Sequence, residues 1–260
     1  MLLYKAWLET RLRFSIAVMA VIVLTAFYVL WRPSAVERMH HLMLLHPDLH
    51  RPWWFDRQLN EYRFYIWRIL FNDELRDLWL VCAIVLGAGG LTPESVRGSA
   101  AFTLSLPVRR RRLAQVHLAV IAAELGILAV IPAAVLPVLS PLVNNSYSPV
   151  EAVGRGLLLA TAGLVVLGLV FAVSAMIESA YTPVVVCFAI LLAWGSVFGP
   201  YNEGLAEPLG FRLVDLFRLT SGPPDFAWNA FPWMGVLLSL SVALTLALLA
   251  IQLTELRDYR

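Results

Sequence analysis

Long runs of apolar residues constrain this chain more than any other feature of its sequence. A helix needs about 20 mostly apolar residues to cross the hydrocarbon core of a membrane, which is about 30 Å thick. Six stretches come close to this length or exceed it: 14–31, 78–91, 113–139, 152–177, 182–198 and 231–253. The second is short, and we expect its helix to extend backward through residues 73–77. The pattern predicts an all-α integral membrane protein with about six transmembrane helices in one domain, residues 1–260.

The composition excludes the main soluble classes. Hydrophobic residues make up 60% of the chain and charged residues only 15%. Soluble globular domains are typically about 45–50% apolar and about 25% charged. A fold of this size in water has no room to hide so much apolar surface. The net charge of +2 is too small to indicate nucleic-acid binding, so we expect no nucleic-acid partner.

The positions of Lys and Arg near the span ends predict the orientation, because cytoplasmic loops of membrane proteins carry an excess of them. With the N-terminus inside, inner and outer segments carry equal numbers of these residues, but the inner segments are about half as long. The four arginines at 109–112, directly before the third span, are the strongest single signal. We therefore expect both termini in the cytoplasm.

The segments between the spans have distinct characters. Residues 1–13 place apolar and charged side chains on opposite faces, which is typical of an amphipathic helix on the inner membrane surface. We expect residues 32–76 to form the first and largest outer loop. Residues 199–230, rich in Gly, Pro and aromatics, form the outer loop before the last span. Residues 92–112 form an inner loop.

The inner loop contains the signals of a short helix. Thr92 suits an N-cap, Pro93 suits the first helical position, and Glu94 complements the positive end of the helix dipole. Pro107 separates this helix from the next span. A short helix between two spans is suited to receive force from a soluble partner. The alternative is a solvated connector whose arginines only fix the topology.

The same loop resembles a known family. Glu94, then Gly98-Ser99, then Thr103-Leu104-Ser105-Leu106-Pro107-Val108 and arginines from Arg109 are similar to the pattern of ABC-2 type transporter permeases, the membrane subunits of ATP-binding-cassette exporters. Ser99 stands where the family commonly has Thr, and Arg109 where it commonly has Ser. The motif covers about 20 residues, while the layout of spans and termini covers nearly the whole chain.

The resemblance implies a permease that pairs with a second permease copy and binds a separate P-loop ATPase in a bacterial plasma membrane, with membrane lipid around it. ATP and Mg would then lie on the partner, and the chain itself, which has no ATPase motif, would be no enzyme. The loop would couple the two proteins. The coupling residues that the motif implies are Glu94, Arg97, Gly98, Ser99, Thr103, Leu106, Pro107 and Arg109.

Two polar residues interrupt the third span. Glu124 lies near its middle, and His117, seven residues earlier, falls on the same helical face. An intramembrane carboxylate is costly and therefore suggests function. One interpretation places both residues on a translocation path, where they would serve an ATP-independent secondary transporter as a proton relay. The other is a protonated Glu124 that bonds to a neighbouring helix and stabilises assembly.

The first outer loop offers imidazole and thioether groups that suit copper or zinc. They belong to His40, His41, Met43 and His46, whose spacing matches no standard metal site. The alternative is an interfacial helix whose side chains pack against lipid headgroups. We find no set of residues that would form a catalytic site, and we expect no metal or other cofactor on this chain.

Overall fold

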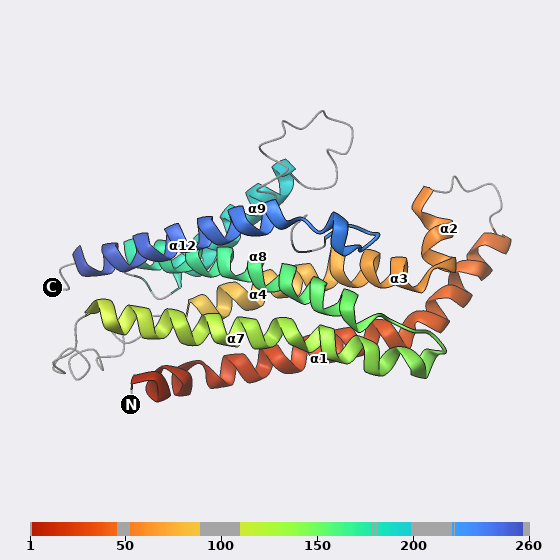
Figure 1. The fold of residues 1–260 in the computed structure, drawn as a ribbon, viewed down its shortest axis with the longest axis horizontal. Coiled ribbons are helices and arrows are strands. Elements are labelled where there is room, and N and C mark those ends of the chain that lie inside the picture. The colour runs from red at the N-terminus through yellow and green to blue at the C-terminus, as the bar shows by residue number, and fades with distance from the viewer. Residues whose placement is uncertain are drawn as a thin grey trace.

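The computed structural model describes residues 2–45, 53–88, 110–177, 179, 181–198, 220 and 222–256. Within these ranges every regular element is a helix (Figure 1). The elements are α1 (Leu2–Leu45), α2 (Trp53–Asn60), α3 (Tyr62–Tyr65), the π-helix η1 (Ile66–Glu74), α4 (Leu75–Gly87), α7 (Arg110–Leu139), the 3₁₀ helix η2 (Ser140–Val143), α8 (Pro149–Met176), α9 (Thr182–Phe198), the 3₁₀ helix η4 (Trp228–Ala230) and α12 (Trp233–Leu256).

Four helices are long and apolar enough to cross a membrane: α1, α7 with η2, α8 and α12. This confirms an all-helical chain with several membrane-spanning helices. The other two predicted spans correspond to α4, with 13 residues, and α9, with 17. A full crossing takes about 20 residues. Helix α9 falls short of this length, and α4 reaches it only together with the helical run that precedes it from Tyr62. The prediction of six spans is therefore supported for four.

Helix α8 lies at the centre of the bundle. It packs against α12, α7, α4 and α9, and it is the most buried of the four long helices. Glycines let neighbouring backbones approach it closely. A Cβ atom at Gly156 would lie 2.8 Å from the carbonyl oxygen of Ala129 on α7, and one at Gly168 would lie 3.1 Å from the carbonyl oxygen of Ala243 on α12. Small residues at such contacts are how membrane helices gain van der Waals packing.

The first helix corrects the prediction for residues 1–13. No break separates these residues from the span, because α1 continues from Leu2 to Leu45. Its 44 residues extend about 66 Å at 1.5 Å per residue. The N-terminal turns do not form a separate surface helix, since Glu9 and Thr10 contact side chains of α7. In Figure 1, α1 and α7 run side by side.

The segment 32–76, predicted as the first outer loop, is helical wherever the structure describes it except at Glu61, and its place outside the membrane stays a prediction. Residues 32–45 belong to α1, and 53–74 form α2, α3 and η1. From Tyr62 to Gly87 the chain is continuously helical, so the helical run that ends with α4 includes residues 73–77 as expected. The nine residues of η1 are π-helical, a form that is rare in such length.

Different helix ends lie at the two ends of the bundle. The N-terminal end of α1 and the C-terminal end of α12 lie at the same end of the long axis (Figure 1). At this end α4 also finishes and α7 begins, whereas α2 and α3 lie at the opposite end. Such an arrangement is compatible with two termini on one side of a membrane. The cytoplasmic assignment of that side stays a prediction.

Candidate functional site

The predicted coupling loop lies almost wholly outside the described residues. The structure describes nothing between 88 and 110, which includes every coupling residue from Glu94 to Arg109. It does describe the flanking helices: α4 ends at Gly87 and α7 begins at Arg110. Residues 199–219 and 221 of the predicted outer loop also lie outside the described part of the chain.

The two polar residues of the third span both contact α1. Nε2 of His117 lies 2.9 Å from Oε2 of Glu9, and Oγ1 of Thr10 donates a hydrogen bond to Oε1 of Glu124. His117 and Glu124 are only 2% and 3% exposed. We name these four residues the polar seam. The structure thus brings both predicted residues to one interface, α1 against α7.

The polar seam contains two separate contacts. His117 and Glu124 are seven residues apart, which is about 10 Å along a helix. Nδ1 of His117 lies 3.3 Å from the carbonyl oxygen of Leu113, so both ring nitrogens have oxygen partners. Oε2 of Glu124 is buried and has no hydrogen-bond partner among the described residues. The seam is therefore fully satisfied at His117 and only half satisfied at Glu124.

The weak candidates for metal ligands lie only partly within the described residues. His40, His41 and Met43 lie on the last turns of α1, and His46 lies outside the described residues. In the part of the chain that the structure describes, no group of three His, Cys, Asp or Glu side chains could hold a metal ion.

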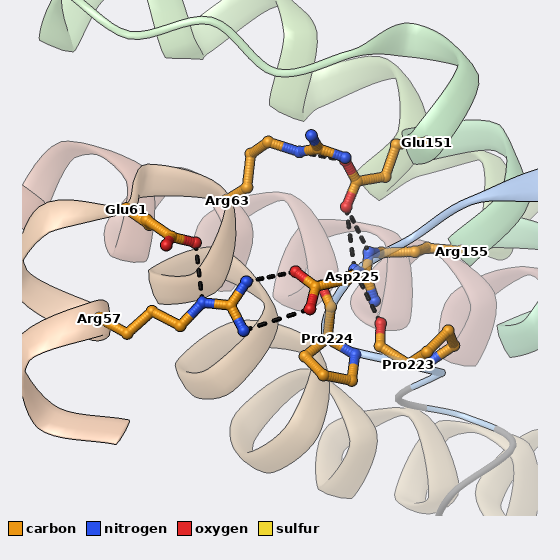
Figure 2. Close-up of polar contacts among 8 residues, drawn as sticks. All are labelled: Arg57, Glu61, Arg63, Glu151, Arg155, Pro223, Pro224 and Asp225. Carbon is orange, nitrogen blue, oxygen red and sulfur yellow. Dashed lines mark hydrogen bonds and ion pairs between the residues drawn. The ribbon is translucent and has the colours of Figure 1, made fainter. Parts of the chain in front are cut away.

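A second polar cluster surrounds the N-terminal turns of α8 (Figure 2). Arg155 is completely buried, and its guanidinium donates to Oε1 of Glu151, with Nη2 at 2.9 Å. Nε of Arg155 also donates to the hydroxyl of Tyr147 at 3.0 Å. Burial raises the pKa of Tyr147, which keeps the phenol neutral and able to accept this bond. A buried arginine needs such partners, because an unpaired charge in this environment is costly.

Glu151 links α8 to α3. Its Oε2 accepts a hydrogen bond of 2.7 Å from Nε of Arg63, while its Oε1 faces Arg155. The carboxylate is 2% exposed and bridges two arginines from different elements. Both of its oxygens are charge-paired, which is what makes burial of a carboxylate tolerable.

The segment before α12 completes the cluster. Nη2 of Arg155 donates to the carbonyl oxygens of Pro223 and Pro224, at 3.2 and 3.3 Å. Arg57 on α2 donates through both Nη atoms to the carboxylate of Asp225 and through Nε to Glu61. The bond to Asp225 is the main cause that raises the pKa of Arg57 above its usual value.

We call the six charged side chains in Figure 2 the ionic clamp. They are Arg57, Glu61, Arg63, Glu151, Arg155 and Asp225. Three cations face three anions, so the clamp carries no net charge. It joins α2, α3, α8 and the segment before α12, which are far apart in the sequence.

Sequence reasoning missed the ionic clamp. Arg63 and Arg155 entered only as charges that help to set the orientation, although Arg155 interrupts an apolar stretch. Two signals were available: Glu151 with Arg155, and Arg57 with Glu61, are each four residues apart, a spacing at which opposite charges meet on one helical face. The links to α3 and to Asp225 have no local signature, because the partners lie 88 and 168 residues away.

Comparisons with known proteins give no relative for this chain. No protein-family model, no curated protein and no solved structure matches it. A functional assignment therefore depends on the residues themselves and on their arrangement.

Proposed function

We propose that this chain is the transmembrane permease subunit of an ABC-2 type transporter, which couples ATP hydrolysis on a separate ATPase to export of a substrate. The observation that carries the proposal is the motif between Glu94 and Arg109, in a segment that joins two apolar helices. The four membrane-spanning helices support the proposal, because a permease must be a multi-pass protein.

The position of the motif within the chain also supports this function. The segment that holds it joins the end of α4 to the start of α7, at the same end of the bundle as both terminal helix ends (Figure 1). In the proposed complex this end faces the cytoplasm of a bacterium, where the ATPase docks. A second permease copy completes the transporter in the plasma membrane.

Co-purification tests the coupling role. Glu94→Arg is expected to lower the yield of the ATPase that co-purifies with the permease, or to abolish substrate stimulation of its hydrolysis. Asp56→Arg is the matched control, since Asp56 is an exposed acid on α2 at the opposite end of the bundle. An unchanged complex with unchanged stimulation in Glu94→Arg contradicts the coupling role.

A secondary transporter that works without ATP is the second candidate. The unpartnered Oε2 of the buried Glu124 favours it, because an intramembrane carboxylate with a free oxygen can take up and release a proton. Proteoliposomes that contain only this chain separate the two functions. Substrate uptake driven by a pH gradient, and lost in Glu124→Gln, supports the secondary transporter and contradicts dependence on an ATPase.

A further inference from the structure

Each of residues 222–226 contacts another part of the bundle. The carbonyl oxygen of Gly222 accepts a bond of 2.9 Å from Nε1 of Trp67 on η1. Those of Pro223 and Pro224 accept from Arg155, and the carboxylate of Asp225 accepts from Arg57. The ring of Phe226 lies against Gly154 so closely that a Cβ atom there would overlap it. We name residues 222–226 the strap.

The strap has little means of holding itself in place. Pro223 and Pro224 have no backbone N–H, so they cannot donate to a helix or a strand. Gly222 has φ +64°, a left-handed conformation that glycine adopts without strain. The path of the strap therefore depends on donors that other elements supply.

The arginines that hold the strap keep a partner without it. Arg155 also bonds to Glu151, and Arg57 also bonds to Glu61 (Figure 2). The hydroxyl of Tyr147 is a further partner of Arg155. If the strap moves away, each arginine still has a partner. Release would be prohibitively costly only if it left a buried charge unpaired. The losses include hydrogen bonds to carbonyls, one exposed ion pair, and the contacts of Phe226 with Gly154 and with the Arg155 guanidinium.

The contacts that Arg155 and Arg57 make with the strap differ in exposure to solvent. Arg155 is fully buried, whereas the side chain of Asp225 is 73% exposed and that of Arg57 30%. Exposed ion pairs are weak and are screened by salt, while buried ones are screened far less. The Arg57–Asp225 pair is therefore the part of the attachment that opens first.

We propose that residues 222–226 form a releasable strap, with the Arg57–Asp225 pair as its latch. In the fastened state the latch ties the segment before α12 to α2, and the carbonyls of Pro223 and Pro224 cover Arg155. In the released state each arginine keeps only its partner in the bundle. The device needs no ATPase and does not depend on the proposed transport function.

Thr220, two residues before the strap, supplies a reporter. Its side chain is fully buried, and Thr→Cys nearly preserves its volume. With the two buried native thiols, Cys82 and Cys187, changed to Ala, Thr220→Cys is the only thiol in the full chain. The rate at which a bulky, water-soluble maleimide modifies it in lipid nanodiscs measures how often the strap is released.

Asp225→Asn is expected to raise this rate about two- to fivefold, the range that loss of an exposed ion pair gives. About 1 M salt, which shortens the screening length to about 3 Å, should raise the rate of the parent protein toward that of the variant. Glu61→Gln removes the charged partner of Arg57 that lies outside the strap. The modification rate of this variant should equal that of the parent protein or be lower. The exchange Arg57→Asp with Asp225→Arg should restore slow modification.

The parent protein in this comparison carries Thr220→Cys and the two Cys→Ala changes but is otherwise unaltered. If adding Asp225→Asn leaves its modification rate unchanged, the proposal is overturned, since the strap would then be a permanent part of the bundle. Modification of the parent protein as fast as of the chain unfolded in detergent would overturn it too, because the strap would not be fastened. Helical circular dichroism and elution volume show that each variant is folded. Asp225 is exposed, so its replacement leaves the core intact.

Discussion

Buried polar side chains in this bundle differ in how many alternative bonding partners they have. Thr10 is the clearest case, because its hydroxyl lies 3.4 and 3.3 Å from the carbonyl oxygens of Ala6 and Trp7 as well as beside Glu124. If Glu124 is removed, Thr10 can bond to its own helix. Arg155 has no such substitute for Glu151, since its charge needs an anion. The two contacts should therefore respond differently to mutation.

Substitution of Glu124 separates a structural role from a role in transport. Glu124→Gln keeps a hydrogen-bonding group beside Thr10 and should leave assembly unchanged. Glu124→Leu should lower the free energy of unfolding by less than about 1 kcal/mol, because membrane hydrogen bonds average about 0.6 kcal/mol and Thr10 has alternatives. Unfolding in detergent and transport per assembled protein are the measurements. Altered transport or an altered pH profile in Glu124→Gln places the carboxylate on the transport path.

Removal of Arg155 should be far more damaging. Arg155→Met leaves Glu151 buried with Arg63 as the one cation that contacts it among the described residues, and loss of one member of a buried pair typically costs about 3–5 kcal/mol. The double variant Glu151→Leu with Arg155→Met should recover part of this loss, because no buried charge then remains. Thermal unfolding of the parent, the single variants Arg155→Met and Glu151→Leu, and the double variant in one detergent measures the coupling. Strict additivity of the two single effects contradicts a direct interaction.

At the scale of elements, glycine positions show how closely helices approach. Gly156 and Gly126 lie on adjacent helices, α8 and α7, but only Gly156 has a backbone oxygen of its neighbour within 3 Å of where a Cβ would be. Around Gly126 nothing lies within 4 Å of that point. The same substitution should therefore have opposite consequences.

Gly156→Ala should destabilise the bundle by about 1–3 kcal/mol, the usual cost of overpacking, since α7 must move away from α8. Gly126→Ala is the matched control and should be neutral or slightly stabilising, because alanine favours helix over glycine by up to about 1 kcal/mol. Unfolding midpoints in mild detergent compare them. Equal midpoints for the two variants would mean that α7 and α8 do not pack as closely as described.

The elements also show what local sequence predicts and what it does not. The apolar lengths of α7, α8 and α12 are visible in the sequence, as is the backward extension of α4. The misplaced start of α1 has a physical cause: Glu9 looks like a solvent-facing residue of a surface helix, yet it pairs with His117, 108 residues away. Two pairs within the ionic clamp were readable for the converse reason, since Glu151 and Arg155, like Arg57 and Glu61, are only four residues apart.

At the scale of the whole molecule, the arrangement of helix ends bears on which end of the bundle faces the cytoplasm. Both terminal helix ends, the end of α4 and the start of α7 share one end (Figure 1). Four arginines at 109–112 favour the cytoplasm for this end. All the described parts of the ionic clamp lie near α2 and α3, and so would face outward.

Cysteine labelling of intact cells tests this orientation. Asp56→Cys on α2 should react with an impermeant thiol reagent that is added outside. Ser99→Cys, in the segment between α4 and α7, should react only after the cells are permeabilised. The native thiols Cys82 and Cys187 are buried and give little background. The inverse pattern would reverse the orientation and remove the cytoplasmic docking role of residues 92–112.

The central place of α8 has a consequence for biogenesis. Chains emerge from the ribosome N-terminus first, so α1 and α7 are both in the membrane before the helix that most of the bundle packs around. The polar seam can close at that stage, because all four of its residues are already synthesised. The ionic clamp cannot, since Asp225 arrives about 70 residues after Arg155. Until then the charge of Arg155 can be paired with Glu151, which lies four residues earlier on the same helix.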